Sequence, residues 1–265
     1  MLKPFLTMTV GLAVFVIVGA AVSSVMIRRQ SSTVELLCRL TEGGEAQGDE
    51  AVAILRERAA ALAGGLGISR WEITREGPEV RVSATARRGL ETFAETLLRR
   101  GLVSFHEGAP ATGPNGPLEC PEGFRAASFS DYIFRTKGDF GERVERRTDL
   151  FVREEPEIEI AGLDGCTYHT EGIFRAPVVT LEFRPADAER FAGISERLKG
   201  KLLAVCVDGE VRAAALLAEA ITGGRVQMRG LRDKEVARTL AAILRAGALP
   251  CALECLSVPE ACDGQ

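Results

Sequence analysis

The amino-terminal segment constrains this chain most, because no side chain from Pro4 to Ile27 carries a charge. As a helix rising about 1.5 Å per residue, the segment can cross a hydrocarbon layer roughly 30 Å thick with some tilt. The alternative is a cleaved signal peptide with Ala21-Val22-Ser23 as its cleavage motif, but the apolar run exceeds the roughly 7–15 residues of a typical signal core. We therefore expect a retained transmembrane anchor. Both interpretations send the rest of the chain to a membrane surface or across it.

Charge excludes one class of partner but does not orient the anchor. Lys3 precedes the apolar segment and Arg28 and Arg29 follow it, so the positive-inside bias is nearly balanced. These are the only charged residues among the first 29, so the remainder is more acidic than the net charge of −4 for the whole chain. An acidic surface repels phosphate backbones, and one Trp and two Tyr offer little for base stacking. We expect no nucleic-acid partner.

Hydrophobic periodicity over residues 32–107 predicts the order β-α-β-β-α-β, which is that of a ferredoxin-like split βαβ unit. The predicted elements are a strand at 32–40, a helix over 50–65 with Asp49 as its cap and Gly64-Gly65 as its stop, a hairpin over 70–84, a helix over 89–101 and a strand over 102–107. A stretch rich in Gly and Pro follows over 107–123 and predicts a domain boundary.

The second half begins with sequence of weak periodicity and ends with well-punctuated elements. The predicted elements are short strands at 131–135, 149–153 and 157–162, a strand over 177–185, a helix over 186–200, strands over 202–207 and 210–215, a short strand at 225–230, a helix over 233–247 and a strand over 252–258. Asp208-Gly209 predicts a type I′ hairpin turn with positive φ at both residues. Asp233 is the expected cap of the last helix, and Gly247 its stop.

Four landmarks in the last third of the chain occur together in a known family. They are Gly200-Lys201 before an apolar strand, the Asp208-Gly209 hairpin, the ITGG turn from Ile221 to Gly224, and LRAGALP from Leu244 to Pro250. In this order they resemble the first periplasmic domain of SecD, the membrane subunit that assists the Sec protein-export channel. The resemblance extends more faintly to residues 150–163 and 54–83.

The resemblance implies an α+β fold with one amino-terminal transmembrane helix, a ferredoxin-like base assembled from both ends of the domain, and an inserted α+β head. The implied boundaries are 1–30 for the anchor and its flank, 31–107 for the first part of the base, 108–230 for the head, and 231–265 for the closing helix and strand of the base with the tail. It further implies a single-pass protein of the inner membrane, with a cytoplasmic amino end and the bulk of the chain in the periplasm.

The sequence departs from the family pattern at three places. The Leu-Asp-Leu-x-Gly-Gly motif after the anchor is replaced by TEGGEA at 41–46, and the Ser-Ala-Pro after the hairpin by Ala213-Ala214-Ala215. The helix bundle that carries the acidic residue for proton-driven work has no counterpart before Gln265. We therefore expect a SecD-like periplasmic domain on a single anchor, without a proton-driven motor of its own.

Reactive side chains form no strong motif. The sequence has no His-Glu-x-x-His, Walker loop or nucleophile elbow, and His106 is expected to be a core residue at the end of a strand. Cys166, His169 and Cys120 offer three zinc ligands at most, so a metal site is the least favoured alternative for them. We expect no catalytic, cofactor-binding or metal-binding residues, and no enzyme.

The seven cysteines leave their pairing open. Cys38 and Cys206 lie in apolar strand-like runs, as small buried residues do. In an oxidising compartment, two pairs are candidates for disulfides: Cys120 with Cys166, and Cys255 with Cys262. Spacing alone does not fix the connectivity.

Three functions are open to such a chain. The favoured one is a tethered periplasmic domain that assists export by binding translocating or newly exported polypeptide, or by docking on Sec translocon subunits. The alternative is a structural or envelope-assembly protein that reuses the fold without an export role. The least favoured is a hydrolase, which a contact between His169 and a Ser or Cys in a cleft would support.

Overall fold

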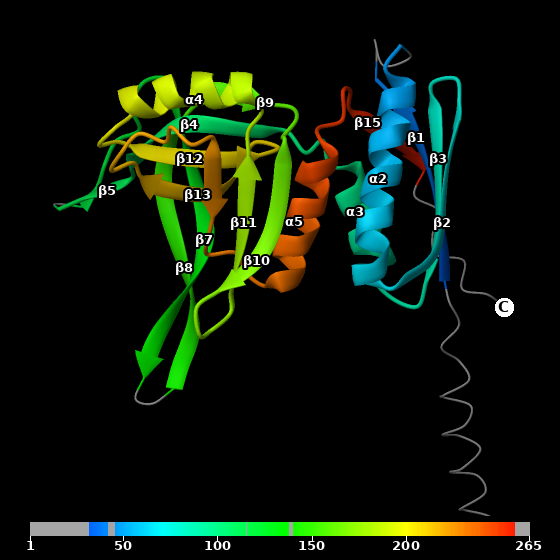
Figure 1. Ribbon diagram of the computed structural model, residues 1–265, viewed down its shortest axis with the longest axis horizontal. Helices are drawn as coiled ribbons and strands as arrows, with labels where there is room; N and C mark the ends of the chain where they lie inside the picture. The colour runs from blue at the N-terminus through cyan, green and yellow to red at the C-terminus, as the bar shows by residue number, and fades with distance from the viewer. Residues whose placement is uncertain (1–31, 42–45, 115, 138–139, 258–265) are drawn as a thin grey trace, which may run out of the picture.

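The computed structural model describes residues 32–41, 46–114, 116–137 and 140–257. They form two lobes, here called the base and the head, with helix α5 (Lys234–Ala246) between them (Figure 1). Sheets and helices occur in both lobes, so the predicted α+β class is confirmed. The predicted anchor over Pro4–Ile27 lies outside the described residues. Within those residues, no helix is both long enough and apolar enough to cross a membrane.

The base is a four-stranded antiparallel sheet with two helices packed on one face (Figure 1). Its elements are β1 (Ser32–Leu40), α2 (Gly48–Leu66), β2 (Ile68–Glu76), β3 (Glu79–Ala86), α3 (Leu90–Leu98) and β15 (Leu253–Ser257). The strand order is β15-β1-β3-β2, so the last strand of the chain pairs with the first. Helices α2 and α3 lie between this sheet and α5 (Figure 1).

Alternation along the base strands explains the core of this lobe. Val80 and Val82 on β3 and Ile73 on β2 point to one face and are buried against Leu55 and Ala59 of α2 and their neighbours. Burying each large aliphatic side chain contributes about 1.5–3 kcal/mol. The opposite face of the sheet is polar, as expected for an antiparallel sheet with one solvated side.

The ends of α2 differ from the prediction. Gly64 and Gly65 lie within the helix, which ends at Gly67, where φ is +71°. That left-handed conformation suits Gly because it lacks a Cβ atom. Asp49 does not cap the helix, because the helix begins at Gly48 and Asp49 lies in its first turn, where the carboxylate accepts a hydrogen bond from Arg75 Nη1 at 2.7 Å.

The head is built on a six-stranded sheet in which five strands follow the order β13-β12-β4-β8-β7 and the short β9 pairs with β4. Their bounds are Val103–Pro110 for β4, Phe124–Lys137 for β7, Phe140–Arg153 for β8, Ile158–Ile160 for β9, Leu202–Val207 for β12 and Glu210–Leu216 for β13. The strand predicted at 102–107 as the last of the base unit is β4, and it lies in the sheet of the head. It pairs with β12, β8 and β9, because the segment after α3 has already crossed into the head.

A second, three-stranded sheet of order β10-β11-β14 completes the head, together with helix α4. The bounds are Gly165–Glu171 for β10, Ala176–Glu182 for β11, Pro185–Arg197 for α4 and Arg225–Met228 for β14. A two-stranded ribbon, β5 (Thr112–Gly113) with β6 (Gly116–Pro117), extends from the side of the head (Figure 1).

The predicted Asp208-Gly209 turn and the predicted ends of α5 are confirmed. Asp208 and Gly209 have φ values of +53° and +78°, as a type I′ turn requires. Asp233 caps α5 by accepting a hydrogen bond from the Val236 amide at 2.8 Å, and Gly247 follows the end of the helix.

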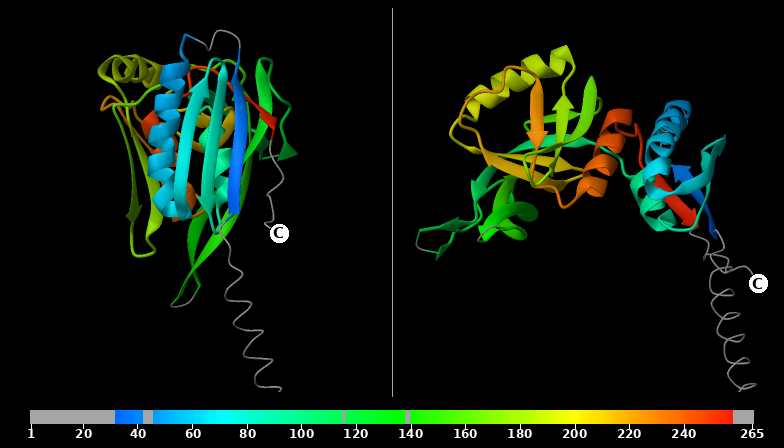
Figure 2. Two further views of the ribbon diagram at one scale, coloured as in Figure 1. Left: turned by 90° about the vertical axis from the view of Figure 1, so that its right-hand side faces the viewer. Right: turned by 60° about the horizontal axis from the view of Figure 1, so that its bottom comes forward.

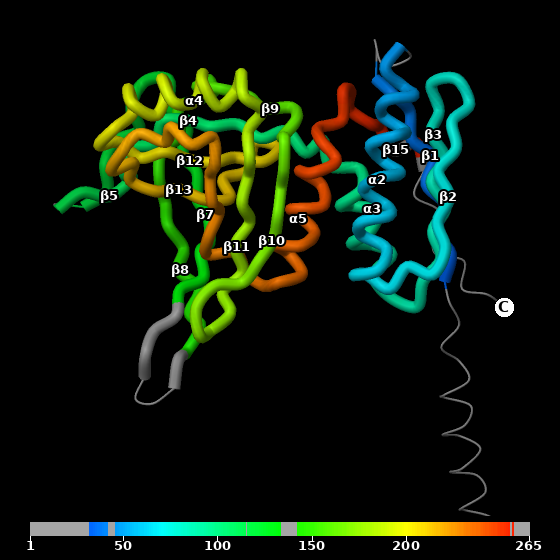
Figure 3. The backbone as a smooth tube through the Cα atoms, viewed as in Figure 1, coloured from blue at the N-terminus to red at the C-terminus, as the bar shows by residue number. Residues whose placement is uncertain are grey.

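The weakly periodic region forms one long hairpin instead of separate short strands. Strands β7 and β8 pair in register from Phe124↔Arg153 to Lys137↔Phe140, so the strands predicted at 131–135 and 149–153 are segments of much longer ones. Figure 1 shows the hairpin extending away from the body of the head, and Figure 3 traces the part of both strands next to that body. Exposure alternates along β7 from residue 126 to 131, but polar residues such as Ser130 and Asp131 lie on both faces, so the sequence lacks the apolar alternation that would have indicated the length of the strand.

Arg58 of α2 joins the two chain segments that cross between base and head. It is fully buried, and its guanidinium donates to the carbonyl oxygens of Leu97, Arg99, Arg100 and Gly247. Burial lowers the pKa of Arg58 to about 10, against an opposing effect of Asp208, so the side chain stays charged at neutral pH. The segment after α3 and the segment after α5 are thereby held by one side chain.

Candidate functional site

A groove of about 570 Å³ opens in the head between two walls of different chemistry. The polar wall is one face of the three-stranded sheet and carries Thr167, His169, Thr180, Glu182, Arg225 and Gln227. These residues share a face because Thr180 pairs directly with Thr167 and Gln227, and Glu182 with Arg225. The apolar wall comes from β12, β13 and the segment after β13, and includes Leu203, Val205, Ala213, Ala215, Leu217 and Ile221.

The polar wall is held by ion pairs at its two ends and has an unused hydroxyl near its centre. Glu182 pairs with Arg225 at 2.9 Å, and Glu171 with Arg229 at 3.0 Å. The hydrogen bond from His169 and the charge of Arg229 lower the pKa of Glu171. Thr180 is 8% exposed, and among the described residues its Oγ1 has no hydrogen-bond partner. Buried polar atoms are usually paired, so a hydroxyl without a partner is unusual, but this oxygen lies beneath the surface of the wall.

One of the four sequence landmarks, the ITGG turn, lies beside the groove, as does the alanine triplet that departs from the family pattern. Ala213-Ala214-Ala215 follows the Asp208-Gly209 turn and lines the groove, where its small side chains occupy little of the space between the walls. Ile221, which begins the ITGG turn, is held by Ser195 of α4: the buried Ser195 Oγ accepts from the Ile221 amide and donates to the Ala192 carbonyl, both at 2.9 Å. Both features therefore shape the groove.

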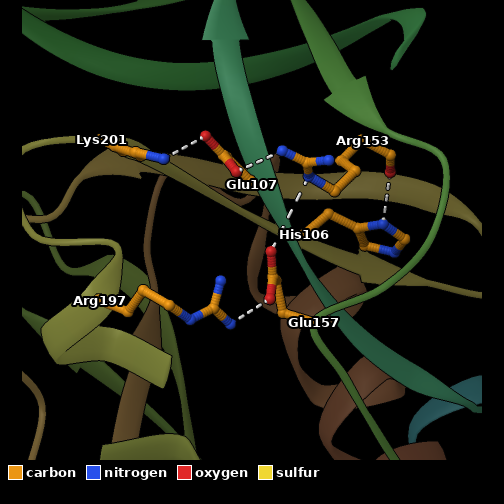
Figure 4. Close-up of polar contacts among 6 residues, drawn as sticks. All are labelled: His106, Glu107, Arg153, Glu157, Arg197 and Lys201. Atoms are coloured by element: carbon orange, nitrogen blue, oxygen red, sulfur yellow. Dashed lines mark hydrogen bonds and ion pairs between the residues drawn. The ribbon is translucent and has the colours of Figure 1, made fainter. Parts of the chain in front are cut away.

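The landmark Lys201 belongs to a chain of ion pairs outside the groove, shown in Figure 4. Lys201 and Arg153 both contact Glu107, at 2.7 and 2.8 Å, and Arg153 and Arg197 both contact Glu157, at 3.9 and 2.5 Å. Glu107 is only 13% exposed. The network ties β4, β8, α4 and the start of β12 together, which is a structural role.

Glu107 makes this network sensitive to acid. Burial acts to raise the pKa of Glu107, but the hydrogen bonds from Lys201 and Arg153 outweigh it and hold the pKa below its ordinary value of 4.5. A lowered pKa stabilises the fold above the unfolded-state pKa, and the stabilisation is lost as the pH falls through the folded-state pKa. The free energy of unfolding of Glu107→Gln should therefore lie below that of the unsubstituted chain at pH 7 and approach it below about pH 4.5. Urea denaturation across this range tests the expectation.

The exposed Glu119 offers the control, because a Glu119→Gln variant should differ little from the unsubstituted chain at either pH. A deficit of Glu107→Gln that stays constant down to pH 3 would contradict the ionic role.

His106 is a core residue, as predicted. It is 5% exposed, and its Nδ1 and Nε2 lie 2.8 Å from the Arg153 carbonyl and 2.9 Å from Ser104 Oγ. Because a carbonyl only accepts, Nδ1 carries the proton and Nε2 accepts from Ser104. Burial is the main cause that lowers the pKa of His106, so the ring is neutral at pH 7. Ser104 is also buried, so this serine–histidine contact is closed to a substrate in this structure.

The cysteines and His169 do not come together. Cys120 is exposed before β7, Cys166 is buried in the head core, and both are free thiols, so their candidate disulfide is absent. His169 contacts Glu171 at 3.1 Å and not a Ser or Cys. Among the described residues no three His, Cys, Asp or Glu side chains are grouped as metal ligands, and the Cys120–Cys166–His169 set is not assembled. The candidate partner Cys262 lies outside the described part of the chain.

Two cysteines of the head, Cys166 and Cys206, are buried away from solvent. Burial raises the pKa of Cys166 to about 12 and that of Cys206 to about 11, so neither is a thiolate at neutral pH.

The groove itself was not predicted, because its walls come from five strands and one connecting segment that are far apart in sequence. The alanine triplet Ala213–Ala215 was the one local signal for it.

Comparison with known proteins assigns the class of the head. Residues 138–251 match the family model described as the SecDF P1 head subdomain. The chain is 44% identical over 78 residues to a protein translocase subunit SecD of Acidaminococcus fermentans, and 40% identical over 81 residues to a protein translocase subunit SecDF of Thermus thermophilus. These alignments cover 29% and 31% of this chain, but 19% and 11% of the relatives. Residues 138–251 are thus similar to the head subdomain of SecD and SecDF proteins, and the resemblance seen in the sequence is confirmed for this part of the chain.

Solved structures extend the likeness of the fold beyond the head. A structure described as "Structure and function of a membrane component SecDF that enhances protein export" matches with a TM-score of 0.59 at 22% identity, covering 85% of this chain and 99% of that one. A crystal structure of SecDF in a "Super-membrane-facing form" gives a TM-score of 0.58, covering 86% of this chain and 30% of that one. At this identity the likeness concerns the fold, and it includes the base.

Proposed function

We propose that this chain is a membrane-tethered periplasmic domain of the SecD type, which assists protein export by binding extended polypeptide in the groove of its head. The observation that carries the proposal is the groove itself, which has one polar and one apolar wall in a head of the SecD family. Relatives that share this head are protein translocase subunits.

The two walls suit an unfolded chain better than a folded partner or a small polar molecule. An extended polypeptide turns successive side chains to opposite sides, so apolar residues can meet Leu203 and Val205 while polar ones face Thr180 and Gln227. Such contacts depend little on sequence, which suits a subunit that handles many exported proteins.

Location and partners form part of the same proposal. The uncharged segment Pro4–Ile27 would anchor the chain in the inner membrane and place the head in the periplasm, next to polypeptide that emerges from the Sec translocon. The domain would act by binding, without an enzymatic step or a cofactor. Docking on translocon subunits would bring the groove to its substrate.

Photocrosslinking in intact cells tests the groove. A photoreactive amino acid in place of Ala215, which is exposed at the apolar wall, should form adducts with newly exported polypeptides. The same amino acid at Thr74, which is exposed on the polar face of the base sheet, is the matched control and should form few. Mass spectrometry of the adducts identifies the partners.

The outcomes separate the two main functions. Adducts of many secretory proteins at position 215 support the export role. Adducts of one envelope-assembly protein, or equal labelling at positions 215 and 74, would exclude a polypeptide-binding groove and favour an envelope-assembly role.

A further inference from the structure

The last part of β13 is an open strand edge next to the groove. β13 stands at the end of the strand order of the six-stranded sheet, and among the described residues its only ladder is with β12. Up to Arg212 the strand faces β7 across a small depression, which Arg125 bridges by donating to the Gly209 carbonyl at 2.8 Å. The residues from Ala213 to Leu216, here called the edge segment, lie beyond that depression, and Leu216 is 65% exposed.

The residue after the strand shows which backbone groups of the edge segment point outward. The Leu217 amide donates to the Lys201 carbonyl at 2.9 Å, and the Leu217 carbonyl accepts from the Gly200 amide at 2.8 Å. In an antiparallel strand, the amide and carbonyl groups of successive residues alternate between the two sides of the strand. The groups of Leu216 and Ala214 therefore point away from β12, where the described chain offers them no partner strand.

The edge segment lacks the features by which proteins usually block a free edge, which are charged side chains, prolines and bulges. Its sequence is Ala-Ala-Ala-Leu, and the bulge in β13 lies before it. The opposite edge of the same sheet is β7, which carries Arg125 and Asp131 and is partly closed by a hydrogen bond from the Tyr132 amide to the Gly230 carbonyl at 2.9 Å. An uncharged edge that stays open in the folded protein is suited to the addition of a strand.

The edge segment continues directly from the apolar wall of the groove. Ala213 and Ala215 line the groove, and Leu216 is the next residue of the same strand. Figure 1 shows β13 beside β12, and the right view of Figure 2 shows β14 of the polar wall, in orange, crossing the direction of this pair. A polypeptide that leaves the groove along β13 therefore runs across the strands of the polar wall and beside the free edge.

We propose that a stretch of the extended polypeptide held by the groove adds to the edge segment as a further β-strand, paired with the backbone groups of Ala214 and Leu216. Main-chain hydrogen bonds give affinity without selecting a sequence, and the exposed Leu216 side chain offers an apolar contact to a neighbouring side chain of the added strand. This inference rests on the proposed function, which supplies the extended polypeptide. It adds that the polypeptide is recognised by its main chain.

Binding of a fluorescein-labelled peptide of alternating threonine and valine to the full chain in detergent micelles tests the pairing. Leu216→Pro removes one outward amide of the edge segment, and proline is tolerated in an edge strand where its missing N–H faces outward. The matched control is Leu216→Val, which keeps the amide and suits a strand. A second peptide carries N-methyl groups on successive central residues, which blocks both of its own edges and leaves its side chains in place.

The unsubstituted chain and Leu216→Val should bind the unmodified peptide equally well. Leu216→Pro, or the N-methylated peptide, should weaken binding about fivefold or more, because a main-chain hydrogen bond is lost and the edge is obstructed. Urea denaturation checks that Leu216→Pro is folded. The N-methylated peptide tests the pairing on the unsubstituted chain, so the result does not depend on that variant alone.

Three other outcomes would overturn the inference. Equal affinities in all combinations, with crosslinked adducts still formed at position 215, would show that the groove holds polypeptide by side chains alone, and the proposed function would stand. Absence of peptide binding together with absence of adducts at position 215 would exclude both. Sedimentation that shows a dimer of the unsubstituted chain and a monomer of Leu216→Pro, at unchanged peptide affinity, would assign the edge segment to a second copy of this chain.

Discussion

Replacing Arg58 by methionine should lower the free energy of unfolding by about 3 kcal/mol or more, although Arg58 does not line the groove. A buried charge can often be exchanged for an apolar side chain at little cost when its partners are exchanged as well. Here the partners are backbone carbonyls of Leu97, Arg99, Arg100 and Gly247, which no side-chain substitution removes. Each carbonyl that stays buried without a donor costs about 1–3 kcal/mol, and Arg100 keeps one donor, the Leu249 amide.

Arg58→Lys should recover only part of the loss, because one ammonium group cannot reach both crossing segments as the forked guanidinium does. Gly101 shows how closely the side chain is enclosed, since a Cβ atom there would lie 2.6 Å from Arg58 Nη2. The matched control is Arg56→Met on the same helix, where an exposed arginine makes one bond to the Ile73 carbonyl at 2.8 Å. Chemical denaturation gives the free energies, and limited proteolysis between residues 99 and 102 reports the crossing directly. Equal losses for the Arg58 and Arg56 variants would show that the junction is held by packing alone.

What the sequence predicted correctly was determined locally. The turn at Asp208-Gly209 and the cap at Asp233 depend on φ preferences and on hydrogen bonds within three residues, so composition and spacing suffice to place them. The end of α2 was misplaced by two residues, because a Gly pair within a helix is tolerated when its neighbours are buried on both sides. These errors move an element boundary but leave the element in place.

What the sequence could not give is determined by partners distant in the chain. The apolar pattern of the strand at 103–110 is compatible with a place in either lobe. Its place is decided by β12, which pairs with it in the head, and by β15, which pairs with β1 and closes the base; they follow about 100 and 150 residues later. The resemblance to SecD pointed to a base closed by the end of the chain. The antiparallel pairing of β1 with β15, in which Cys38 lies opposite Cys255 in the strand register, agrees with it. The groove is a tertiary feature of the same kind.

Phe105→Ala should be the most damaging substitution in the head, with an expected loss of about 3–5 kcal/mol in the free energy of unfolding. Phe105 on β4 is fully buried, and its ring lies 4.7 Å from that of Phe191 on α4 and 5.5 Å from that of Phe183, which follows β11. Phe183 and Phe191 also contact each other, at 5.0 Å and an interplanar angle of 74°. The three rings thus join both sheets of the head to its helix, and a cavity at position 105 would separate them.

The effect should be confined to the head and should reach the groove. Val205, on the apolar wall, pairs directly with Phe105, so Phe105→Ala should also reduce crosslinking from position 215, whereas Phe105→Leu, which retains most of the apolar volume, should lose clearly less of both. The matched control in the other lobe is Phe93→Ala, because Phe93 is 1% exposed in the base core. Hydrogen exchange should rise mainly in β4, β11 and β12 for Phe105→Ala and mainly in β1, β2 and β3 for Phe93→Ala. If either variant opens both lobes equally, α5 and Arg58 couple the two cores into one cooperative unit, and the head does not hold its groove independently of the base.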